Sequence, residues 1–143
     1  MTAITVTAAK VAVVFPEEAE IYNVVAAEAL TKGEALYQTT SGTYGVAQAD
    51  DLDKLQFRGV ALEAVSKGEG LSMLKRGILA GYTLATYEDE VYLSDTAGVF
   101  DTAPGTQLVK CGRVMSLADP SLTEVLYVNA DWLHEWGSGD YDD

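Results

Sequence analysis

Short runs of β-prone apolar residues, separated by turn signals, make up most of this chain. These runs cover residues 2–15, 21–26, 57–65, 71–75, 78–86, 108–117 and 122–128. Gly, Pro and Asp residues bound them at intervals of about 8–12 residues, which is typical of short strands joined by tight turns. The pattern predicts an all-β fold: a small single-domain barrel or sandwich of short antiparallel strands.

One hairpin occurs twice in the chain. Residues 34–47 and 90–103 each hold a β-prone run, a polar turn centred on a glycine, and an aromatic residue soon after it. The spacing from Glu34 to Glu90 equals the spacing from Gly42 to Gly98. Both glycines lie where a tight turn needs a positive φ, which glycine adopts without strain. We therefore expect each copy to be two antiparallel strands joined at its glycine.

A second similarity follows each hairpin. Arg58-Gly59-Val60-Ala61 comes after the first copy, and Cys111-Gly112-Arg113-Val114 comes after the second. Both segments are β-prone and contain a glycine between larger residues. The sequence therefore predicts a hairpin-then-strand unit that is present twice.

The two ends of the chain differ from this repeated part. We divide the chain into an N-terminal arm with the first strands (1–29), a β-rich domain (30–128) and an acidic tail (129–143). The apolar run before Pro16 is either an extended arm or an ordinary first strand of the barrel. As an arm it would expose unpaired backbone, which a neighbouring subunit could pair with. On that interpretation, deleting residues 1–15 leaves a folded protein that binds its partner weakly.

Seven apolar residues in these ends are candidates for contacts with a partner. In the tail, the two tryptophans are spaced i, i+4 and would share one face of a short helical turn. They would either plug the end of their own barrel or anchor in a pocket of a neighbour. The candidates are Ile4, Val6, Val11, Val13, Phe15, Trp132 and Trp136.

Composition and charge narrow the class of protein. The chain has 143 residues and is 48% hydrophobic, which is enough for one domain with a substantial core. Its 22 acidic and 9 basic side chains give a net charge of −13, which disfavours nucleic acid and anionic membrane surfaces. No apolar run approaches the roughly 20 residues that span a bilayer. The N-terminus lacks the pattern of a signal peptide.

The sequence offers little for catalysis. The lone Cys111 cannot form an intrachain disulfide or a cysteine-built metal site, and a buried structural role is expected for it. The lone His134 supports neither a catalytic triad nor a metal site. The aspartates at 50–53 lack the Gly and Glu of a calcium loop, because Leu55 and Ala61 occupy those places. We expect no catalytic residues, no metal, no cofactor and no enzymatic activity.

Several segments resemble one family. Residues 59–70, 75–78, 91–98 and 109–114 have an order of strands, glycines and small residues that resembles the head-decoration, or capsid cement, proteins of tailed bacteriophages. The resemblance covers about residues 30–117. It implies a small β-rich, β-tulip-like virion protein, made in the host cytoplasm, that binds the major capsid protein on the outer capsid surface. It also implies a homotrimer that stabilises the shell against internal DNA pressure.

Two other functions remain open. Lys75, near Met73 and close to a predicted turn, is weakly similar to the modified lysine of biotin or lipoyl carrier domains. Trp132, Trp136 and surface tyrosines could instead form the sugar platforms of a carbohydrate-binding β domain.

Overall fold

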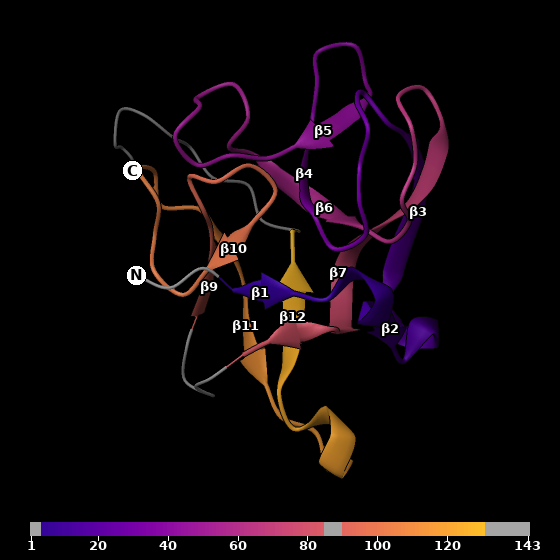
Figure 1. The fold of residues 1–143 in the computed structure, drawn as a ribbon, viewed down its shortest axis with the longest axis vertical. Helices are drawn as coiled ribbons and strands as arrows, with labels where there is room; N and C mark the ends of the chain where they lie inside the picture. Colours follow the sequence, from indigo (N-terminus) through magenta and orange to yellow (C-terminus); the bar gives the residue numbers. More distant parts are fainter. Residues whose placement is uncertain (1–3, 85–89, 131–143) are drawn as a thin grey trace.

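A computed structural model describes residues 4–84 and 90–130, and this part of the chain is all-β (Figure 1). Three short 3-10 turns accompany the strands there: η1 (Ala8–Lys10), η2 (Pro16–Glu18) and η3 (Pro120–Leu122). The strands are β1 (Thr5–Val6), β2 (Ala12–Val14), β3 (Glu20–Val25), β4 (Ala35–Gln38), β5 (Tyr44–Val46), β6 (Phe57–Ala61), β7 (Gly70–Ala80), β8 (Tyr82–Thr83), β9 (Glu90–Leu93), β10 (Phe100–Asp101), β11 (Lys110–Met115) and β12 (Val125–Asn129). The all-β prediction is confirmed.

One antiparallel sheet carries most of these strands. Its order is β10-β9-β11-β12-β7-β6-β4-β5, with β2 and β3 also paired to β7, and it curls into a half-barrel. The long strand β7 therefore pairs with four others: β6, β12, β2 and β3. Since β7 joins strands from the beginning, middle and end of the chain, it is the central element of the fold.

The order of strands in this sheet shows the repeat that the sequence predicts. The order β5-β4-β6-β7 in the first half is matched by β10-β9-β11-β12 in the second, and the two halves meet where β7 pairs with β12. Gly42 (φ 92°) joins β4 to β5, and Gly98 (φ 75°) joins β9 to β10; both strand pairs are antiparallel. Both hairpin predictions are confirmed.

The glycine after each hairpin allows a close approach between strands. A Cβ added at Gly59 on β6 would lie 2.6 Å from the carbonyl oxygen of Leu74 on β7. A Cβ added at Gly112 on β11 would collide with the carbonyl oxygen of Tyr127 on β12. The two glycines thus have the same role in the two halves, which explains why the sequence repeats them.

The two hairpin turns have different surroundings. The turn at Gly98 packs against the first hairpin: its carbonyl accepts a hydrogen bond from the Ala35 amide (3.0 Å), and its amide donates to the Ala47 carbonyl (2.8 Å). No atom would lie within 4 Å of a Cβ at Gly42. The second turn therefore helps to close the half-barrel, whereas the first projects into solvent.

Aromatic rings fill the centre of the larger core. Phe100 packs edge-on against Phe57 and Tyr82, with ring centroids 5.8 Å and 5.9 Å apart. The Tyr82 hydroxyl donates to the Gly33 carbonyl at 2.9 Å, so this buried polar group is satisfied. Burial raises the pKa of Tyr82 above its ordinary value. A smaller core, which includes Leu71 and Met73 of β7, lies apart from this cluster.

The N-terminal stretch is built into the same structure. β1 pairs with β8, and β2 pairs with β7. Ile4 and Val11 belong to the larger core, with 6% and 1% of their surface exposed. The prediction of an extended arm is therefore wrong for this segment: its backbone finds partners within the chain, and the side chains of Ile4 and Val11 belong to the core.

Another local prediction fails at Arg76-Gly77, which separates the predicted runs 71–75 and 78–86 and is therefore expected to be a turn. β7 runs through both residues without interruption, because Gly77 pairs with Val128 of β12. A Cβ at Gly77 would lie 3.0 Å from the Cβ of Ala19, so the glycine leaves room for the segment before β3. The β-prone run at residues 21–26 does form a strand, β3.

Candidate interaction surface

The predicted contact residues separate into three groups. Ile4 and Val11 are buried in the core, so they cannot contact a partner without unfolding. Val6 and Phe15 are 37% and 45% exposed, and Val13 is partly buried against the core. Trp132 and Trp136, with the predicted helical turn, lie outside the described residues, as does His134.

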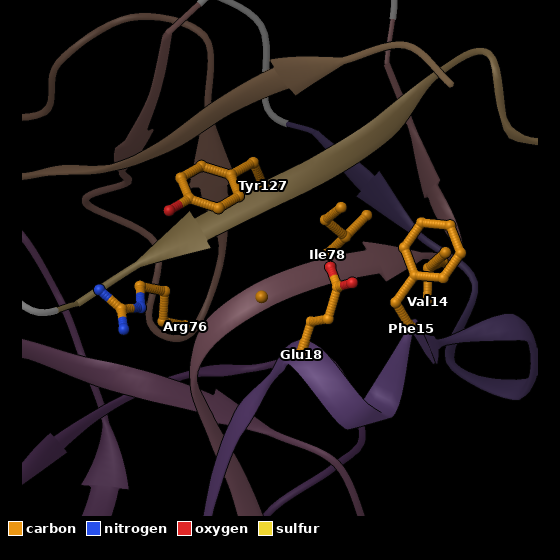
Figure 2. Close-up of a pocket in the computed structure, with 7 residues that line it drawn as sticks. Val14, Phe15, Glu18, Arg76, Ile78 and Tyr127 are labelled. Atoms are coloured by element: carbon orange, nitrogen blue, oxygen red, sulfur yellow. The ribbon is translucent and has the colours of Figure 1, made fainter. Parts of the chain in front are cut away.

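A small pocket lies beside Phe15 (Figure 2). It has a volume of about 160 Å³ and is lined by residues of β2, η2, β7 and β12: Val14, Phe15, Glu18, Arg76, Gly77, Ile78 and Tyr127. Phe15 and Glu18 reach it from the N-terminal segment, and Tyr127 from the neighbouring strand β12. Pockets for drug-sized molecules are typically larger, about 300–1,000 Å³, so this one suits a single side chain of a partner.

The backbone of Phe15 is strained. Its φ and ψ are 60° and 65°, the left-handed region, which costs a bulky L-residue about 1–2 kcal/mol. The following Pro16 disfavours the right-handed helical region for Phe15. The Phe15 carbonyl also accepts the Glu18 amide at 2.9 Å, which closes the turn η2. In this conformation the aromatic side chain of Phe15, just after β2, remains 45% exposed.

The charges around this pocket are of both signs. Arg76 forms an ion pair with Glu20, with 3.4 Å between the guanidinium and carboxylate atoms, and both side chains are more than a third exposed. Glu17 and Glu18 on η2 are exposed. Within the described ranges, no ion pair is formed by either of these two carboxylates.

A second exposed apolar group lies on β3. Ile21, Tyr22 and Val25 are 38%, 49% and 44% exposed. They are not among the contact residues predicted from the sequence, although residues 21–25 have apolar side chains at both odd and even positions. Because a strand places successive side chains on opposite faces, these residues make both faces of β3 apolar.

The alternative of a modified lysine receives no support from the position of Lys75. The residue lies in the interior of β7, away from any turn, and its ammonium group is 6.0 Å from the centre of the Tyr22 ring. It thus has the place of an ordinary strand residue, partly covered by its neighbour on β3.

The remaining reactive groups have structural surroundings. Cys111 is 1% exposed, and burial raises the pKa of its thiol well above the ordinary value. On β9, the Glu90 carboxylate accepts hydrogen bonds from Lys110 (3.1 Å) and from the Tyr92 hydroxyl (3.0 Å), and these lower its pKa. The contact with Lys110 links β9 to β11 across the sheet. Among residues 4–84 and 90–130, no group of three or more potential metal ligands is found.

No helix among the described residues is long and apolar enough to cross a membrane. Comparisons with the models of known protein families, with curated proteins and with solved structures find no match.

Proposed function

We propose that this protein decorates the head of a tailed bacteriophage. It would bind the major capsid protein on the outer surface of the shell, as a homotrimer in the virion, and stabilise the assembled particle. The proposal makes it a structural protein and not an enzyme.

The observation that carries the proposal is the resemblance in the order of strands and glycines. Its four segments fall on β6 with the following turn, on β7, on β9 with the Gly98 turn, and on β11. These elements form the framework of the half-barrel, and the two glycines of close approach lie among them. The resemblance therefore involves the parts of the chain that determine the fold.

Two features of the surface fit this role. The exposed apolar groups at Phe15 and on β3 offer contact area for a protein partner. The high negative charge would keep the free protein soluble until it meets a shell.

We expect the purified protein to sediment with capsids that were assembled without it, and to reach saturation at a fixed number of copies per shell. The measurement is co-sedimentation at increasing protein concentration, with quantification of the bound protein. Capsids already carrying their full set of this protein are the control and should take up none. If the protein stays in the supernatant at all concentrations, the proposal is wrong.

Two other measurements test the alternative functions. A biotin or lipoyl adduct on Lys75, seen in the intact mass, would support the carrier domain. Binding to a glycan array that Trp132→Ala abolishes would support the carbohydrate-binding domain.

A further inference from the structure

β3 is a strand with an unused edge (Figure 1). It has six residues, Glu20–Val25, and in the part of the chain that the structure describes it pairs with β7 alone. An antiparallel neighbour uses the backbone groups of every second residue, so the others direct their N–H and C=O groups away from β7. The unused edge is about 20 Å long at 3.3 Å per residue.

This edge lacks the usual protection against pairing with another chain. Natural edge strands are kept short or carry charges, prolines or bulges. β1 and β2 follow this rule, with two and three residues. From Ile21 to Val25, β3 has no charge and no proline, and its one register shift lies before Ile21. Two β-branched residues on this stretch, Ile21 and Val25, are more than a third exposed.

The surroundings of the edge indicate what would bind there. Glu17 and Glu18 are exposed just before the strand, and Glu28 is exposed just after it. Beside the end of β3 lies an open pocket of about 400 Å³, lined by Val25, Ala27, Thr43 and Lys67 among others. The Ala27 amide donates to the Tyr44 carbonyl at 2.7 Å, so a docked segment would end beside Val25, where its last side chain could enter this pocket.

A second copy of the chain is a poor occupant for this edge. Pairing of two β3 strands would bring two chains of the same sign edge to edge, each with exposed glutamates at both ends of the strand. Like charges close together repel, and each copy carries a net charge of −13.

We propose that β3 is a docking edge for an extended segment of another protein, one with β-prone apolar residues in its centre and Lys or Arg at its ends. Backbone hydrogen bonds to β3 would give affinity, and the carboxylates before the strand would select a basic flank. This inference rests on the proposed function, in which the segment belongs to the capsid protein.

The first test measures the binding of variants to capsids that lack the protein. Ile21→Lys with Val25→Lys puts two charges on the edge, and we expect it to weaken binding at least about tenfold. Leu52→Lys with Leu108→Lys is the matched control: it makes the same chemical change at residues 69% and 51% exposed, and it should bind like the natural protein. Glu17→Lys with Glu18→Lys, which leaves the strand intact, should bind more weakly, most clearly at low salt.

The second test does not depend on capsids. A nine-residue peptide with alternating Val and Thr in its centre and two lysines at each end is titrated into the labelled protein. We expect NMR shifts concentrated at the amides of residues 21–25, and much smaller shifts with a peptide that has glutamates in place of the lysines.

Each outcome decides something. If the edge variant binds capsids as well as its control does, the docking edge is refuted while the proposed function stands. If the natural protein does not bind capsids, the proposed function fails, and the peptide decides the docking edge alone: shifts at 21–25 support it and their absence overturns it. Self-association that the edge variant abolishes, seen by sedimentation velocity, would assign the edge to a second copy and contradict the proposed occupant.

Discussion

Deletion of residues 1–15 is expected to destroy most of the stability of this protein. The deletion removes β1 and β2, and with them the buried side chains of Ile4 and Val11, each of which contributes about 1.5–3 kcal/mol by burial. Leu79 of β7 is fully buried in the full chain and pairs with Val13 of β2, so the deletion would also expose Leu79 to water. Domains of this size are typically stable by about 5–15 kcal/mol, so the loss is a large part of the total.

Thermal unfolding followed by circular dichroism checks this expectation. At about 2–4 °C per kcal/mol, the melting temperature should fall by more than about 10 °C, or the truncated chain should not fold at all. Val6→Ala is the control, because Val6 is 37% exposed, and it should change the free energy of unfolding by less than about 1 kcal/mol. A truncated protein that melts like the full chain would restore the interpretation of residues 1–15 as a dispensable arm.

Gly112→Ala is expected to destabilise the protein strongly, although it adds only one methyl group. That methyl group would overlap the carbonyl oxygen of Tyr127, which belongs to a strand held by its own ladder to β7. Neither backbone can move without breaking pairs at the centre of the sheet. We expect a loss of about 3 kcal/mol in the free energy of unfolding, at the upper end for overpacked sites.

The equivalent position in the first half should respond in the same way. Gly59→Ala places its methyl group 2.6 Å from the Leu74 carbonyl oxygen, and about 2–3 kcal/mol should be lost. Gly70→Ala is the matched control on β7, because the nearest atom to its new methyl group is 3.7 Å away. Chemical denaturation measures all three variants. If Gly112→Ala is as stable as Gly70→Ala, the close approach of β11 and β12 is not a requirement of the fold.

The sequence predicted the repeated part of the fold because its signals there are local. Gly42 and Gly98 each lie between two β-prone runs, and a tight turn needs only such neighbours. The strand at residues 21–26 was likewise visible in its β-branched residues. These features depend on a few adjacent residues, so one sequence is enough to locate them.

Whether the N-terminal stretch is buried or exposed depends on contacts with residues that are distant in the sequence. Val11 is buried because β2 pairs with residues 78–80, and nothing near Val11 in the chain indicates that pairing. The same limit applies to Gly77, which resembles a turn residue locally but lies within a ladder to β12.

The candidate surface was predicted only in part, for a similar reason. Phe15 was identified as an apolar residue at the end of a run, and it is indeed exposed. The unused edge of β3 could not be predicted, because an edge is defined by the absence of a second neighbouring strand. That property belongs to the order of strands in the sheet and not to residues 20–25 themselves.

Heating capsids with and without this protein tests the proposed function most directly. A ligand that binds the assembled shell and not its dissociated subunits stabilises the shell by about 2.7 kcal/mol per site at a concentration of 100 Kd. We therefore predict that the temperature at which filled capsids release DNA, followed with a dye, rises with protein concentration and levels off when the sites are full. A release temperature that stays constant while co-sedimentation shows saturated binding would contradict the proposal that this protein stabilises the shell.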